Sequence, residues 1–127
     1  MAKVLLVEDD EIQRMAYRRF LELDKHVVKD VADGNEALRI FERNPREFDV
    51  VVTDVLMPGL DGAALIYGLH KLRQDVRVIA ISAGRRVLTP EFALQSAKLA
   101  GSLVQLAKPF TRGSMSAAME SVLGARI

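Results

Sequence analysis

The chain has 127 residues, 50% of them hydrophobic, and a formal net charge of +1. This length predicts one domain over residues 1–127, and the near-zero charge gives no strong field to attract nucleic acid or a membrane surface. The lack of cysteine excludes disulfides and thiolate metal sites. No apolar run approaches the roughly 18 residues of a membrane span, and the N-terminus does not resemble a signal peptide. We therefore expect a cytoplasmic protein with no membrane insertion and no direct nucleic-acid partner.

Short apolar runs alternate with helical patterns along the whole chain. Strands are predicted at residues 3–7, 26–31, 48–54, 76–82 and 102–107, and helices at residues 11–23, 33–44, 61–72, 89–101 and 111–123. The second strand has the mixed polarity of an edge strand, whereas the third is almost continuously apolar, as a central strand would be. Such alternation predicts an α/β fold, with an open parallel sheet covered by helices on both faces.

Polar side chains stand at the carboxyl ends of the predicted strands, where sheets of this kind bind ligands. Glu8 and Asp9 follow the first strand, and Asp54 and Ser82 end the third and fourth. Lys108 follows the fifth. If these strands are neighbours about 4.8 Å apart, the five residues share one rim. Acidic residues behind a strand often only cap the next helix, but their coincidence with a lysine favours a site.

The rim predicts magnesium and phosphoryl chemistry. Clustered carboxylates cannot all stay ionised without a cation or raised pKa values. Oxygen ligands with open positions suit Mg²⁺, which keeps waters and shares a phosphate. Asp54 would act as a nucleophile toward phosphorus, with the ammonium of Lys108 and the hydroxyl of Ser82 facing the transferred group. Asp10 and Glu11, in contrast, are expected to begin the first helix and to lie in water.

Four motifs, in this order and at these spacings, resemble the receiver domain of bacterial two-component response regulators. They are VLLVEDDE at 4–11, FDVVVTDVLMPGLDG at 48–62, VIAISA at 78–83 and AKPF at 107–110. The resemblance covers essentially the whole chain. It implies a flavodoxin-like, doubly wound sheet of five parallel strands in the order 2-1-3-4-5, with five helices.

The resemblance also implies a role for each rim residue. The implied magnesium ligands are Glu8, Asp9, Asp54 and the backbone carbonyl of Leu56. Asp54 is in addition the implied phospho-acceptor, and Ser82 and Lys108 are implied to contact the phosphoryl group. In this family the lysine usually precedes a cis proline, which is Pro109 here.

Three positions depart from the family's pattern. Gln105 stands three residues before the lysine, where the family usually carries a Tyr or Phe that rotates as a switch. The output signal is therefore expected to be weaker, different or absent. Leu56 and Gly84 stand two residues after the acceptor and after the hydroxyl. Because neither can orient an attacking water, we predict slow self-dephosphorylation, and a half-life of seconds in Mg²⁺ would contradict this.

The implied function is that of a stand-alone response regulator. It would take a phosphoryl group from a histidine kinase or a histidine phosphotransfer protein onto Asp54, and then change its contacts with a downstream protein in a phosphorelay. It would not be an enzyme beyond its own phosphorylation and dephosphorylation.

Two alternatives stay open: a scaffold of the same fold that signals without phosphate, and a receiver cut from a larger multidomain regulator. A phosphatase with an aspartate nucleophile is disfavoured because Leu56 replaces the second acid that such enzymes typically carry. A dinucleotide oxidoreductase is disfavoured because no G-x-G-x-x-G follows the first strand.

Overall fold

A computed structural model describes residues 1–55, 62–82 and 101–124. Its strands are β1 (Lys3–Val7), β2 (Val27–Val31), β3 (Val50–Asp54), β4 (Val78–Ser82) and β5 (Val104–Ala107). Its helices within these ranges are α1 (Glu11–Leu23), α2 (Gly34–Arg43), α3 (Gly62–Leu72) and α5 (Arg112–Gly124). Except for Gly101, the helix predicted at 89–101 lies outside the described residues.

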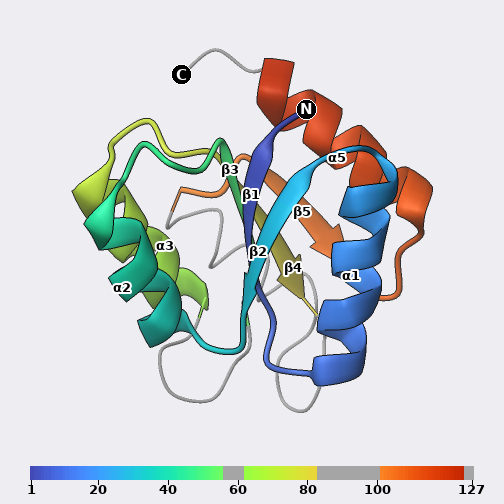
Figure 1. The fold of residues 1–127 in the computed structure, drawn as a ribbon, viewed down its shortest axis with the longest axis horizontal. Helices are drawn as coiled ribbons and strands as arrows, with labels where there is room; N and C mark the ends of the chain where they lie inside the picture. Colours follow the sequence, from blue (N-terminus) through green and yellow to red (C-terminus); the bar gives the residue numbers. More distant parts are fainter. Residues whose placement is uncertain (56–61, 83–100, 125–127) are drawn as a thin grey trace.

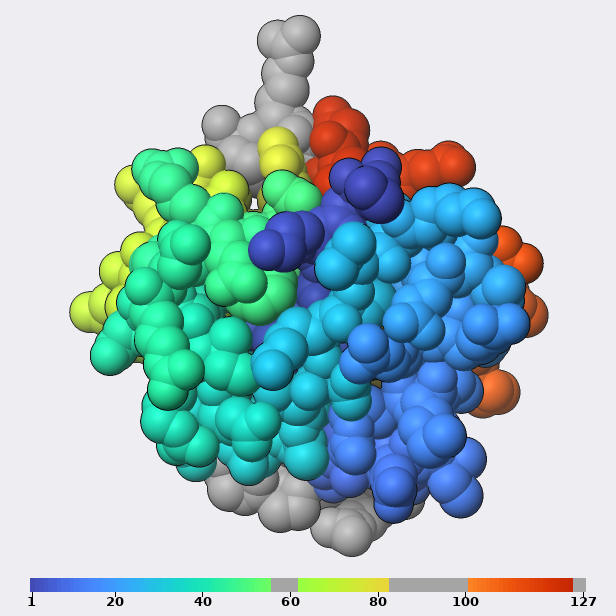
Figure 2. Space-filling view, in the orientation of Figure 1, coloured from blue at the N-terminus to red at the C-terminus, as the bar shows by residue number. Residues whose placement is uncertain are grey.

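The five strands form one parallel sheet in the order β2-β1-β3-β4-β5, which confirms the predicted order. β2 lies at an edge, and every residue of the central β3 is buried, as their sequences predicted. Parallel neighbours need crossovers, and the helices cover both faces, with α1 and α5 on one side and α2 and α3 on the other (Figure 1). In the space-filling view, β2 is a light-blue band between the surfaces of α1 and α2 (Figure 2).

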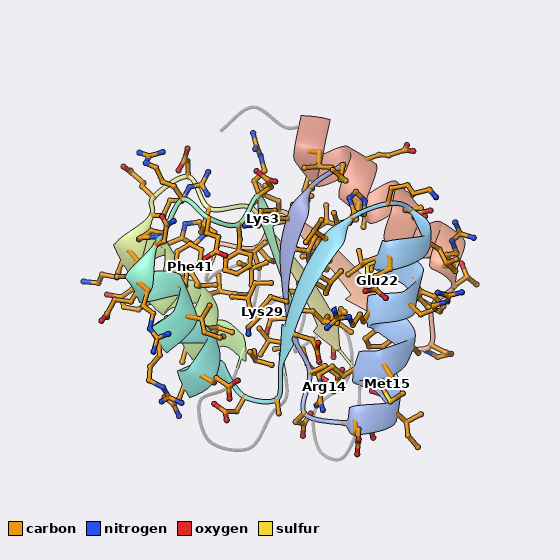
Figure 3. All side chains as sticks on the ribbon, in the orientation of Figure 1. Lys3, Arg14, Met15, Glu22, Lys29 and Phe41 are labelled. Carbon is orange, nitrogen blue, oxygen red and sulfur yellow. The ribbon has the colours of Figure 1, made fainter. Side chains whose placement is uncertain are left out.

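Alternate strand residues enter two cores, one on each face of the sheet. In β1, Leu5 and Val7 pack with residues of α2 and α3, whereas Val4 and Leu6 pack with residues of α1 and α5. Phe41 is fully buried on the sheet side of α2 (Figure 3). Burial on both faces explains why the strand sequences are almost continuously apolar.

The apolar residues of α1 do not all face the sheet. Tyr17 and Leu21, four residues apart, are buried, while Ile12 and Met15 are 80% and 65% exposed. The helix begins as predicted at the acidic run, where the Asp10 carboxylate accepts a hydrogen bond from the amide of Gln13 at 2.9 Å. Within the described ranges, no helix combines the length and apolar character needed to cross a membrane.

The turn before β5 depends on Gly101. Its φ is 110°, in the left-handed region that residues with a Cβ rarely adopt. A Cβ added there would lie 2.6 Å from Nε2 of His70, a residue of α3. The two ring nitrogens of His70 lie 3.0 Å from the carbonyl oxygens of Gln74 and Gly101, so the ring has little room to move.

Gly101→Ala is therefore expected to lower the free energy of unfolding by about 1–3 kcal/mol, because both the backbone and the His70 ring would have to shift. Urea denaturation measures this change. Gly124→Ala is the matched control, since an added Cβ there meets nothing within 4 Å. If the two variants have the same urea midpoint, the turn before β5 relaxes without cost and the prediction is wrong.

Candidate functional site

The residues predicted at the strand ends lie at the carboxyl edge of the sheet. The register pairs Asp54 with Ile81, one residue before Ser82, and pairs Ser82 with Ala107, one residue before Lys108. β1 runs beside β3 on the other side, so the residues that follow β1 reach the same edge. Parallel strands thus bring together groups that are far apart in the sequence.

Three carboxylates meet at this edge. Glu8, Asp9 and Asp54 each offer one oxygen, and these oxygens lie within 4.8 Å of one another. Glu8 and Asp54 are only 1% and 3% exposed, whereas Asp9 is exposed. Hard oxygen ligands that are open to water on one side fit Mg²⁺, which binds few carboxylates and keeps several waters. The cluster therefore has the donor set that a divalent cation requires.

Lys108 brings an ammonium group into the cluster. Its Nζ donates to Oε1 of Glu8 and to Oδ2 of Asp54, both at 2.9 Å, and to Oε1 of Gln13. A lysine ammonium has three N–H donors, so these three acceptors engage all of them. The side chain is 8% exposed, and the Lys108–Pro109 peptide is cis.

One lysine does not balance the acidic charge of the cluster. Burial and the nearby charge of Asp54 raise the pKa of Glu8 to about 7, although the hydrogen bond from Lys108 opposes this. Burial disfavours the charged form of Lys108, but hydrogen bonds to Asp54 and Glu8 outweigh it and raise the pKa of the lysine. Uncompensated negative charge in a largely buried cluster favours binding of a divalent cation.

Local hydrogen bonds hold the acidic residues in place. The amide of Glu8 donates to the carbonyl of Val31 in β2 at 3.1 Å, and Oε2 of Glu8 accepts from the amide of Asp10 at 3.1 Å. The hydroxyl of Thr53 donates to the carbonyl of Asp54 at 2.9 Å. The end of β1 and the start of α1 are thereby tied to each other beside the end of β3.

The other predicted positions differ in what surrounds them. Ser82 is fully buried at the end of β4. Gln105, in β5, is partly buried, and its Nε2 donates to Oγ of Ser102 at 2.8 Å. A hydrogen-bonded amide therefore occupies the position at which the family usually carries an aromatic ring. Leu56 and Gly84 lie outside the described residues.

The sequence alone did not single out the residues of α1 that line the site: Gln13, Arg14 and Tyr17. Arg14 reaches from α1 toward the sheet (Figure 3), where Nη1 donates to the carbonyl of Glu8 at 2.9 Å. Its Nε pairs with Oδ2 of Asp30 in β2 at 3.1 Å. In the sequence, the one feature that marks these residues is their position in the first two turns of the helix that begins at the rim. Tyr17 is four residues after Gln13 and three after Arg14, which are spacings that place side chains on the same face.

The family profile of the response regulator receiver domain matches residues 4–120. Among curated proteins, the transcriptional regulatory protein PrrA of Mycobacterium tuberculosis is 33% identical over 124 residues, which are 98% of this chain and 51% of that protein. The sensor kinase CckA of Brucella abortus is 43% identical over 81 residues, which are 64% of this chain and 9% of that protein. The chain thus spans about half the length of PrrA and about a tenth of the length of CckA.

The solved structures show the same similarity. The receiver domain of a sensor histidine kinase from Pseudomonas aeruginosa, solved with a magnesium ion coordinated in its active site cleft, is 29% identical with a TM-score of 0.84, and 98% of each chain is covered. The chain belongs to the response regulator receiver domain family, whose members form part of both response regulators and sensor kinases.

Proposed function

We propose that the chain accepts a phosphoryl group on Asp54, that Glu8, Asp9 and Asp54 hold the Mg²⁺ needed for this step, and that phosphorylation changes contacts with a downstream protein. The observation that carries the proposal is the meeting of three carboxylates and one lysine at the carboxyl edge of the sheet. Family membership supports it, as does the magnesium ion in the cleft of the Pseudomonas receiver domain.

Bound Mg²⁺ would supply positive charge beside the phosphoryl oxygens. An oxygen of the Asp54 carboxylate attacks phosphorus in line with the leaving group. The P–N bond of a donor phosphohistidine breaks, and its electron pair stays on the imidazole, which then takes a proton from water. Lys108 and Ser82 donate hydrogen bonds to the phosphoryl oxygens, whose negative charge must be held during transfer. The carbonyl of Leu56, outside the described residues, is the proposed fourth ligand.

Phosphohistidine is the donor group of a histidine kinase or a histidine phosphotransfer protein, and we propose one of these as the upstream partner. The output is proposed to be a protein–protein contact, with no enzymatic activity beyond phosphorylation and dephosphorylation of this chain. Because Gln105 carries no ring, a rotating aromatic side chain at that position does not transmit the signal.

A small-molecule donor tests the central step without the cognate kinase. With acetyl phosphate and Mg²⁺, the protein is expected to gain the mass of one phosphoryl group, and it is expected to gain none in EDTA. Intact-mass spectrometry at neutral pH measures the gain, and hydroxylamine should reverse it because an acyl phosphate is labile to that reagent. No gain in mass, together with unchanged amide resonances on adding beryllofluoride and Mg²⁺, would favour a scaffold that signals without phosphate.

Glu8→Gln and Asp9→Asn are each expected to weaken Mg²⁺ binding at least about tenfold, or roughly 1.4 kcal/mol, because each removes one charge from the cluster. Titration calorimetry measures the affinity. Glu11→Gln is the matched control and should stay within about twofold, since Glu11 is the exposed first residue of α1 and lies outside the cluster. Equal losses in all three variants would instead indicate a diffuse acidic patch with no defined site.

A further inference from the structure

One side of the Lys108 ammonium is held by a helix and not by the strands. Oε1 of Gln13 accepts a hydrogen bond from Nζ, and the centroid of the Tyr17 ring lies 5.7 Å from the same atom. Residues four apart in a helix share a face, so both side chains reach the lysine from α1. The carboxylates of Glu8 and Asp54 hold it from the strand ends.

Gln13 differs from the other two acceptors because it is neutral. The oxygens of Glu8 and Asp54 are proposed to be shared with Mg²⁺ and, at Asp54, with phosphorus, so their contacts with the lysine change when the site is loaded. The amide oxygen of Gln13 is proposed to bind neither Mg²⁺ nor phosphorus, so its contact with the lysine does not change in this way. A lysine side chain has four rotatable bonds and loses considerable entropy when it is fixed, so a lasting anchor matters for its position.

Tyr17 limits where the ammonium can move. Tyr17 is 8% exposed, and its ring stacks on the ring of Phe110, with centroids 4.9 Å apart. An aromatic face attracts an ammonium that lies within about 6 Å of its centroid. Phe110 lies two residues after Lys108, so the stacked pair also ties the segment that carries the lysine to α1. Gln13 and Tyr17 together contact the ammonium on the side that faces α1.

We propose that Gln13 is a positioning residue: its amide oxygen, with the Tyr17 ring beside it, fixes the Lys108 ammonium where it meets the phosphoryl group on Asp54. The inference rests on the proposed function, since it assigns a task within phosphoryl binding. Gln13 acts through Lys108. Without it, one N–H of a largely buried ammonium lacks its acceptor, and the ammonium pivots between the two carboxylates.

Two measurements on Gln13→Met, which keeps the length of the side chain but removes the acceptor oxygen, test this inference. The first is the acetylation rate of Lys108 in metal-free protein, mapped by mass spectrometry against the exposed Lys29 as internal reference. Loss of one charge-assisted hydrogen bond is expected to raise that rate about tenfold. Gln13→Glu retains an oxygen acceptor and should keep the slow rate. Gln74→Met, at an exposed position, is the matched control and should change nothing.

The second measurement is the affinity for beryllofluoride in excess MgCl₂, followed by amide resonances. Gln13→Met is expected to bind the anion about tenfold more weakly, while its Mg²⁺ affinity stays near that of the unmodified protein and its circular dichroism spectrum shows that it is folded. Acetylation as slow as in the unmodified protein would overturn the inference, and so would faster acetylation with an unchanged anion affinity. If the unmodified protein binds no beryllofluoride, the proposed function fails, and acetylation alone still decides whether Gln13 holds the lysine.

Discussion

Asp54→Asn is expected to eliminate phosphorylation by acetyl phosphate. The asparagine amide is neutral, so its oxygen lacks the full negative charge of a carboxylate oxygen and cannot serve as the nucleophile toward phosphorus. The substitution preserves size, and the new amide oxygen can still accept the hydrogen bond from Lys108, so the fold is expected to persist. Intact-mass spectrometry should show no phosphoryl gain at any time at which the unmodified protein is labelled.

Asp49→Asn is the matched control for that variant. Asp49 lies just before the other end of β3, where its Oδ2 accepts from the amide of Lys3 at 2.8 Å. The Asp49→Asn variant makes the same chemical change at the edge of the sheet opposite the site. Its phosphoryl gain should equal that of the unmodified protein. Phosphoryl gain in Asp54→Asn equal to that of the unmodified protein would place the acceptor elsewhere, and peptide mapping would then identify it.

Gly62→Ala is expected to lower the free energy of unfolding by about 3 kcal/mol or more. Gly62 begins α3, where the helix passes the end of β3. A Cβ there would lie 2.4 Å from the carbonyl oxygen of Asp54 and 2.4 Å from Cα of Val55. Both are backbone atoms, and the amide of Gly62 donates to the carbonyl of Val55 at 2.8 Å. The helix therefore cannot move away without breaking this hydrogen bond or displacing the backbone of Asp54.

Urea denaturation measures the loss at Gly62, and Gly113→Ala is the control. An added Cβ at Gly113 in α5 would meet its nearest atom, Oγ1 of Thr111, at an ordinary 3.6 Å. Circular dichroism of Gly62→Ala before denaturant is added checks that the variant folds. A loss below about 0.5 kcal/mol, as is usual for surface changes, would mean that the junction of β3 and α3 can open without cost.

Patterns within short segments predicted the strands and the polar residues at their carboxyl ends, whereas the strand order was implied by the resemblance to receiver domains. Continuous apolar runs mark strands buried on both faces, and Glu8, Asp54 and Lys108 stand where such runs end. The face of α1 that is buried was harder to predict from the sequence pattern. Apolar residues lie on more than one side of that helix, and only the position of the sheet decides that Tyr17 is buried while Ile12 is exposed.

Contacts between distant segments could not be read from the sequence. Gln13 and Lys108 are 95 residues apart, and neither periodicity nor a local motif predicts that one accepts a hydrogen bond from the other. The close approach of Gly101 to His70 is similar, since it depends on how the segment before β5 passes α3. A sequence pattern reports the environment of a residue within its own element, whereas these contacts follow from the packing of separate elements.

The ion pair between Glu8 and Lys108 joins residues that are 100 positions apart. The proposed magnesium site shares Glu8 with this ion pair, and its ligands Glu8, Asp9 and Asp54 meet only after β1 and β3 have paired, so an unfolded chain does not contain it. A ligand that binds only the folded chain stabilises it in proportion to the logarithm of ligand concentration over dissociation constant. If the proposed site binds Mg²⁺, the Mg²⁺ concentration also affects how often the chain unfolds, and resistance to proteolysis should rise and fall with that concentration.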